Sequence, residues 1–183
     1  MALAPTLYDF DVALANVDAG VERRLAVKAA RHPSESLPRL WLRLLAYCWK
    51  WEEGIAFGPG LSSPEEPDVL ARGPTGEETL WIRVGRPDPV KLQREADRHP
   101  RAHVAVLFES PARLEEFVSR AREEGLTRLG GAELVAVDPA LLGALSGEET
   151  RRTRLTLTIV GDHLYVERGG LSLDGPLTRV RIS

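Results

Sequence analysis

Apolar and polar residues alternate near both ends of the chain, in the pattern of half-buried β-strands. Residues 8–14 alternate with a period of two, and turn-forming residues lead from them into a second apolar stretch at 21–27. The same alternation occupies 155–160, where Gly161-Asp162 turns the chain into another short strand pattern. These patterns predict a β-hairpin at each end of the chain, followed by a closing strand over 177–182.

Helical spacing replaces the strand pattern after the first hairpin. The apolar residues of 37–48 recur every three or four positions and share one face of a helix. Ser34 or Ser36 can cap this helix, and Pro38 is tolerated only in its first turn. The segment therefore predicts the main core helix.

A serine or aspartate followed by proline recurs four times and predicts four helix starts. Proline suits the first helical position, and the residue before it can accept a hydrogen bond from the first turn. Ser63-Pro64-Glu65-Glu66 also has the glutamate of a capping box, so it predicts a short helix over Pro64–Ala71. The other three pairs open amphipathic stretches: Asp88-Pro89, Ser110-Pro111 and Asp138-Pro139.

Compact apolar runs at 102–108 and 133–137 lie between these predicted helices and suit strands that are buried on both faces. Strands that alternate with helices usually pair in parallel. The chain has 183 residues, of which 43% are hydrophobic, and this length suits one compact core. We predict a single α/β domain over residues 1–183, with one mixed sheet and a hairpin at each end.

The formal net charge of -3 provides no bulk attraction for nucleic acid or an anionic membrane. Residues 151–154, Arg179 and Arg181 could form a local basic edge, but acidic Glu148-Glu149 adjoins it and no aromatic ladder accompanies it. We interpret these residues as a solvated charge cluster. Nucleic acid is therefore a weakly supported partner, and the physiological partner stays open.

Cysteine content and hydropathy indicate a soluble cytoplasmic protein. The single cysteine, Cys48, excludes a disulfide within the chain and is expected to be a core thiol. No apolar run approaches the length of about 18 residues that a membrane span needs. Asparagine, glutamine and methionine occur once each, a scarcity that is typical of heat-adapted proteins.

The segment Thr79–Pro87 contains a strand pattern whose side chains separate onto two faces. Leu80, Ile82 and Val84 point one way. Glu77, Thr79, Trp81 and Arg83 point the other way. The strand therefore has one apolar face and one that carries polar groups.

This segment and Arg31–Ser36 upstream closely resemble the YaeQ family. Further matches follow in the same order along nearly the whole chain: Met1-Ala2-Leu3, Leu42–Tyr47, Gly60-Leu61 and Glu65-Glu66-Pro67. The resemblance implies a variant of the PD-(D/E)XK restriction-endonuclease-like fold, with the two hairpins added to its core.

Nucleases of that class hold Mg²⁺ with several converging carboxylates, usually assisted by a lysine. The resemblance matches Glu35 to their helix glutamate, but it places Thr79 and Arg83 at the two strand positions that are usually acidic. It also places Gln93 and Arg94 where the family has lysines. A guanidinium in place of a carboxylate about 5 Å from a divalent ion changes the interaction by an amount on the order of 10 kcal/mol.

Three functional hypotheses remain. The first is a non-catalytic binding or scaffold protein with a vestigial pocket, in which Glu35 and Glu77 form a salt bridge with Arg83, so that no metal or other cofactor is held. The second is an active phosphodiesterase that binds Mg²⁺ or Mn²⁺ through Glu35, Glu77 and a relocated carboxylate such as Asp88, with Arg83 or Arg94 stabilising the transition state. The third, implied only by the resemblance, is a protein-interaction module linked to transcription.

Other candidate residues carry weaker signals. Arg31 and His32 could contact a phosphate, although an ordinary loop before a helix explains them as well. His99 and His103 have the spacing of a helical metal pair, but Pro100 lies between them and would break the helix. We predict no zinc site.

Overall fold

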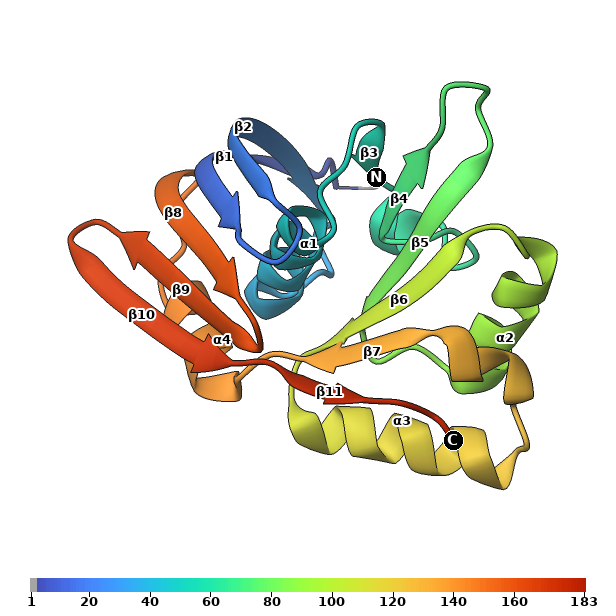
Figure 1. Ribbon diagram of the computed structural model, residues 1–183. Coiled ribbons are helices and arrows are strands. Elements are labelled where there is room, and N and C mark those ends of the chain that lie inside the picture. The colour runs from blue at the N-terminus through green and yellow to red at the C-terminus, as the bar shows by residue number, and fades with distance from the viewer. Residues whose placement is uncertain (1–2) are drawn as a thin grey trace.

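Helix α1 (Leu37–Trp49) lies between two β-sheets, which diverge on either side of it (Figure 1). The computed structural model describes residues 3–183, so Met1 and Ala2 of the N-terminal sequence match lie outside the described residues. The five-stranded sheet contains, in spatial order, β10 (Leu171–Pro176), β9 (His163–Arg168), β8 (Arg152–Val160), β1 (Thr6–Asn16) and β2 (Val21–Arg31). The six-stranded sheet contains β11 (Thr178–Val180), β7 (Glu133–Ala136), β6 (His103–Phe108), β5 (Glu78–Gly85), β4 (Val69–Arg72) and β3 (Ile55–Phe57).

Both predicted hairpins are present, but the prediction of one mixed sheet is wrong. Strands β1 and β2 pair antiparallel along their whole length, and β8 pairs antiparallel with β9. Strands β1 and β8 pair in parallel, so the two hairpins form one five-stranded sheet. The other strands form a second sheet of six strands. Alternation identifies the buried face of each strand, whereas the choice of neighbour depends on contacts between distant segments.

Helix caps confirm three of the four predicted starts beyond the core helix. Asp88, Ser110 and Asp138 each accept a hydrogen bond from the first turn of α2 (Pro89–Arg98), α3 (Pro111–Glu123) and α4 (Pro139–Ser146), respectively. In α1, Ser36 rather than Ser34 is the cap, and Pro38 lies in the first turn.

The predicted helix over Pro64–Ala71 is wrong. A 3₁₀ turn, η1 (Gly60–Ser62), is followed by irregular chain and then by strand β4. The apolar run at the start of β4 is buried between β3 and β5, where strand pairing satisfies its backbone. Tertiary pairing therefore outweighs the local capping signal of Ser63.

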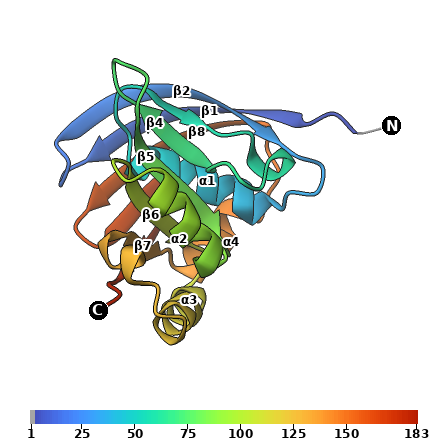
Figure 2. The same ribbon diagram turned by 90° about the vertical axis from the view of Figure 1, so that its right-hand side faces the viewer.

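Strands β5, β6 and β7 are parallel, as predicted, and they separate two hydrophobic cores. The Leu80, Ile82 and Val84 face of β5 packs into the core around α1, together with α4. Trp81, on the other face, packs into a second core beneath α2 and α3, which cover the outer side of this sheet (Figure 2). The predicted separation of side chains on β5 is confirmed. On the second face Trp81 is buried as well, whereas Thr79 and Arg83 are half-buried. Among residues 3–183, no helix is long and apolar enough to cross a membrane.

Glu133 joins parts of the molecule that are distant in sequence. Its carboxylate forms ion pairs with Lys50 after α1 and with Arg179 of β11 at 2.7 Å, and it is hydrogen-bonded to His103 of β6 at 3.1 Å. Arg179 also binds Asp162 in the turn between β8 and β9, on the other sheet. Burial alone would raise the pKa of Glu133, but the hydrogen bonds from His103 and Lys50 and the nearby positive charges lower it to about 2.

Candidate functional site

A pocket of about 520 Å³ lies where the start of α1, the 60–68 segment, the end of β5 and the start of α2 meet. These ends converge because β5 is central in its sheet and α1 packs across it, while α2 follows β5 after a short turn. The resulting walls combine apolar side chains with several charged groups. This is the region that contains Arg83, one of the positions singled out by sequence.

Glu35 lies beside this pocket and is fully engaged by two arginines. Glu35 is 3% exposed. Arg43 donates to both of its oxygens, at 2.7 and 2.8 Å, and Arg39 donates to one of them at 3.0 Å. Residues 35, 39 and 43 are spaced by four, so these three side chains lie along the same side of α1 and its cap. Glu35 is thus the centre of a buried ion-pair network.

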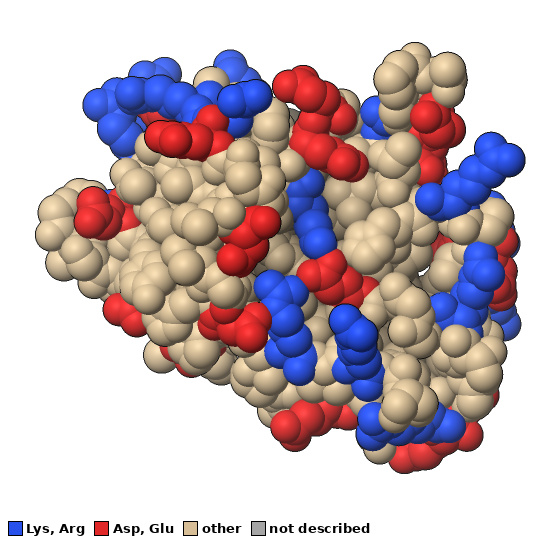
Figure 3. Space-filling view, viewed as in Figure 1, with Lys and Arg blue, Asp and Glu red and all other residues tan. Residues whose placement is uncertain are grey.

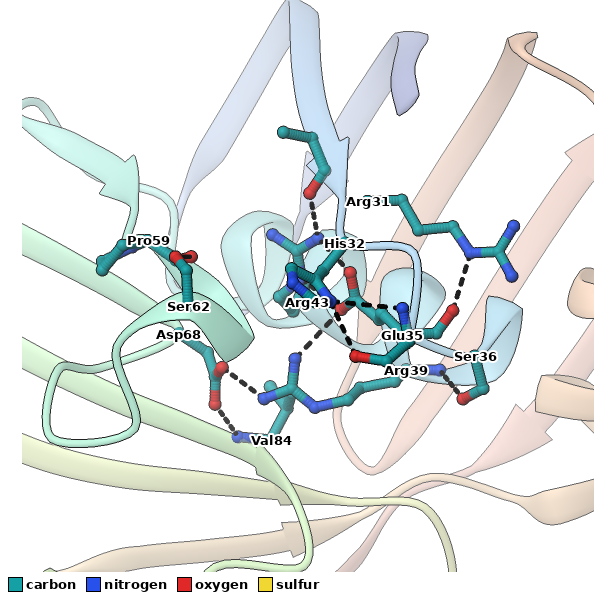
Figure 4. Close-up of polar contacts among 12 residues, drawn as sticks. Arg31, His32, Glu35, Ser36, Arg39, Arg43, Pro59, Ser62, Asp68 and Val84 are labelled. Atoms are coloured by element: carbon teal, nitrogen blue, oxygen red, sulfur yellow. Dashed lines mark hydrogen bonds and ion pairs between the residues drawn. The ribbon is translucent and has the colours of Figure 1, made fainter. Parts of the chain in front are cut away.

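Asp68 is the second buried carboxylate of the network, and it was not among the residues predicted from the sequence. Its side chain accepts a hydrogen bond from the backbone N–H of Val84 at 2.9 Å and forms an ion pair with Arg39. Arg39 therefore bridges Asp68 and Glu35, as the close-up shows (Figure 4). The sequence does contain a feature that could have identified Asp68: it directly precedes the apolar run that becomes β4. A charged residue that is buried with such a run needs a specific partner.

Two cations of the pocket have no carboxylate partner among the described residues. Arg83 donates to the carbonyl oxygen of Pro64 at 2.6 Å, and its guanidinium lies 5.8 Å from the ring centre of Trp81. Lys91, in the first turn of α2, is in no ion pair within residues 3–183. Both side chains line the pocket.

Most acidic groups around the pocket are already neutralised. Asp88 pairs with Arg120 at 3.2 Å, Glu109 pairs with Arg86 at 2.6 Å, and Glu95 forms a bond of 2.9 Å with Arg98 of the same helix. Glu65, at the rim, is exposed and is the one lining carboxylate without an ion pair in the described part of the chain. Among the charged lining groups without an ion pair in the described residues, two are cations, Arg83 and Lys91, and one is an anion, Glu65.

Apart from Arg83 and Asp88, the predicted site residues are not part of the pocket lining. Glu77 is exposed in the turn before β5, where hydrogen bonds from Thr75 lower its pKa. The Thr79 hydroxyl donates to the carbonyl of Ala71 at 3.3 Å. The expected salt bridge of Glu35 and Glu77 with Arg83 is absent from the described residues. Residues 77 and 83 share a face, but six residues of strand separate them by about 20 Å.

Gln93 and Arg94 also lie away from the pocket lining. The Gln93 side chain accepts a hydrogen bond of 3.3 Å from the backbone of Arg128, and Arg94 is exposed on α2. Arg31 donates to the backbone carbonyl of Glu35 at 2.8 Å and pairs with Glu149, so its contacts support the loop before α1. His32 contacts the hydroxyl of Ser34 in that loop.

The donor groups of the pocket do not fit a divalent metal. All four carboxylate oxygens of Glu35 and Asp68 accept hydrogen bonds from arginines or from the backbone. Within residues 3–183, no group of three or more histidine, cysteine, aspartate or glutamate side chains is placed to hold a metal ion. His99 and His103 have separate partners, Glu78 and Glu133. Arg39 occupies the position between the two carboxylates that a shared cation would need.

Comparison with known proteins defines the family. A family model described as "YaeQ protein" matches residues 1–175. The chain belongs to the YaeQ family. Curated relatives from Salmonella typhi and Escherichia coli (strain K12), both named "Uncharacterized protein YaeQ", are 28% identical over 178 residues, which cover 97% of this chain and 97% of each relative.

Solved YaeQ structures have the same fold. The YaeQ protein from Xanthomonas axonopodis pv. citri superposes with a TM-score of 0.86 at 23% identity, over 98% of this chain and 99% of that one. The YaeQ protein from Pseudomonas syringae gives 0.84 at 26% identity, over 96% of both chains. The match therefore establishes family and fold, and the names of these relatives assign no activity.

Gly58 supports the pocket by allowing the backbone to approach Asp68 closely. A Cβ atom at position 58 would lie 1.9 Å from the carbonyl oxygen of Pro67. We expect Gly58→Ala to displace the chain before Asp68 and to lower the free energy of unfolding by about 1–3 kcal/mol. Urea denaturation measures this loss. Gly131→Ala is the matched control, because a Cβ there meets no atom within 4 Å, and equal stability of the two variants would contradict the prediction.

Proposed function

We propose that this YaeQ-family chain is a non-catalytic binding protein whose nuclease-like pocket holds an anionic group instead of a metal ion. One observation carries the proposal: arginines engage the buried carboxylates of Glu35 and Asp68, whereas Arg83 and Lys91 line the pocket without carboxylate partners among the described residues. Phosphate is the favoured anion, since guanidinium and ammonium groups donate several hydrogen bonds to its oxygens.

The surroundings of the two free cations support anion binding. The first turn of α2 lies at the pocket and carries Lys91, whose backbone N–H is already capped by Asp88, so only its side chain is left for a ligand. Leu42, Leu61 and Leu92 provide apolar walls, which strengthen electrostatic contacts by reducing access to water. A volume of about 520 Å³ suits a small molecule.

The proposed relation to the PD-(D/E)XK class has some local support. Pro67-Asp68 supplies a proline-aspartate pair at the start of a strand, and its carboxylate lies in one network with the helix glutamate Glu35. The alternative of an active phosphodiesterase has less support, because Asp88 serves as the cap of α2 and Glu77 lies in a distant turn. On the face shown in Figure 3, acidic and basic side chains are interspersed, so a broad field for a nucleic-acid backbone is not evident there.

Calorimetric titration with monoethyl phosphate tests the proposal. We expect binding by the unmodified protein and at least about a tenfold loss of affinity in Arg83→Glu, because one charge-assisted contact becomes a repulsion. Lys91→Gln should weaken binding severalfold. Arg94→Gln is the matched control, since Arg94 is exposed on the same helix and lies outside the pocket lining.

Two results would overturn the proposal. The first is absence of phosphate binding, or binding that Arg83→Glu leaves unchanged. The second is cleavage of DNA or RNA with Mn²⁺ that Asp68→Asn abolishes, which would favour the phosphodiesterase.

A further inference from the structure

Glu95 is a nearly buried carboxylate that the proposed anion site does not use. It lies on α2, lines the pocket and is 5% exposed. Its one ion-pair partner in the described chain, Arg98, has a side chain that is 64% exposed. Ion pairs with such exposed partners contribute little stability, whereas burying a carboxylate is unfavourable. The ion pair with Arg98 therefore does not explain why Glu95 is buried.

The two carboxylate oxygens of Glu95 have different surroundings. Arg98 donates to Oε1 at 2.9 Å, and no hydrogen bond to Oε2 occurs among the described residues. Within residues 3–183, every fully buried side-chain nitrogen or oxygen has a hydrogen-bond partner. Oε2 is therefore not fully buried, and it belongs to a residue that lines the pocket. The residues that line the cavity with Arg83 and Lys91 thus include one with a free acceptor oxygen.

Two residues of opposite charge consequently lie close together on the part of α2 that lines the pocket. Lys91 and Glu95 are separated by four residues on α2, so their Cβ atoms are about 6 Å apart. The two side chains form no ion pair with each other, although this spacing would allow one. Both groups are therefore available to a ligand that carries a negative and a positive group at a similar separation.

We infer that the ligand of this pocket is a small zwitterion, with a phosphate held by Arg83 and Lys91 and an ammonium group held by the free oxygen of Glu95. The inference rests on the proposed function, because it assigns the anionic end of the ligand to the same two cations. Its new element is the recognition of a positively charged group. The apolar residue Leu92, between Lys91 and Glu95 in sequence, also lines the pocket and can contact the linking carbons.

Two probes that differ by one ammonium group test the inference: O-phosphoethanolamine and monoethyl phosphate. We expect the unmodified protein to bind O-phosphoethanolamine about tenfold more tightly in calorimetric titration, as one charge-assisted hydrogen bond would provide. Glu95→Gln should remove this preference and leave the affinity for monoethyl phosphate within about twofold. Unchanged binding of monoethyl phosphate also establishes that the variant is folded.

Asp97→Asn is the matched control, because it removes one negative charge from the same helix at an exposed position outside the pocket lining. It should retain the preference for the amine. Equal binding of the two probes by the unmodified protein, or a preference that persists in Glu95→Gln, would overturn the inference and leave the anion site intact. If neither probe binds, the proposed function itself fails.

Discussion

Glu35→Ala should lower the free energy of unfolding by about 3–5 kcal/mol, as expected when one partner of a buried ion pair is removed. Arg43, 2% exposed, would lose both carboxylate contacts and keep only its bond to the carbonyl of Ala30. Arg39 would retain Asp68, so the site would contain an excess positive charge. Urea denaturation followed by tryptophan fluorescence measures the loss.

Two variants show whether the uncompensated charge causes this loss. Glu53→Ala removes an exposed carboxylate and should change stability by less than about 0.5 kcal/mol. The double variant Glu35→Leu with Arg43→Met should recover much of the lost stability, because it removes both buried charges and keeps apolar volume. A loss below about 1 kcal/mol in Glu35→Ala would contradict a buried network.

Glu133→Gln should make stability less dependent on pH under acidic conditions. The pKa of Glu133 is lowered to about 2 in the folded protein, against 4.5 as its ordinary value. A depressed pKa adds stability that is fully present above about pH 4.5 and disappears as the pH falls towards 2. The shift corresponds to at most about 3 kcal/mol at pH 7.

Denaturation curves at several pH values provide the measurement. The unmodified protein should exceed Glu133→Gln in stability by about 2–3 kcal/mol at pH 7, and the two curves should converge between pH 4.5 and pH 2. Glu115→Gln removes an exposed carboxylate and should not change this pH dependence. A difference that stays constant down to pH 2 would mean that the charge of Glu133 is not its source.

The sequence predicted the features that depend on neighbouring residues. The caps Ser36, Asp88, Ser110 and Asp138 contact backbone groups only three residues away, so they follow from short motifs. The two faces of β5 follow from the alternation of side chains along a strand. Ser63 has an equally good local signal, but the pairing of β4 with its neighbours determines the structure there.

The candidate site was predicted only in part, because its partners come from separate segments. Glu35 and Arg83 were found by resemblance, whereas Asp68 reaches the site through the pairing of β4 with β5. The four-residue spacing of Glu35, Arg39 and Arg43 could have identified the arginines that neutralise the glutamate. Glu77 shares a strand face with Arg83, but a shared face does not bring two residues together when six residues of strand, or about 20 Å, separate them.

The double contact of Arg39 has a consequence for the evolution of the pocket. Substituting an acid for Arg83 would add a third carboxylate, yet Glu35 and Asp68 would remain bound to Arg39. Substituting Arg39 alone would leave Asp68 without its ion-pair partner in a water-poor environment. Evolution of a metal-dependent enzyme from this chain would therefore require at least two substitutions, neither of which is useful on its own. Because the two depend on each other, we expect descendants of the chain to keep the present arrangement of charges.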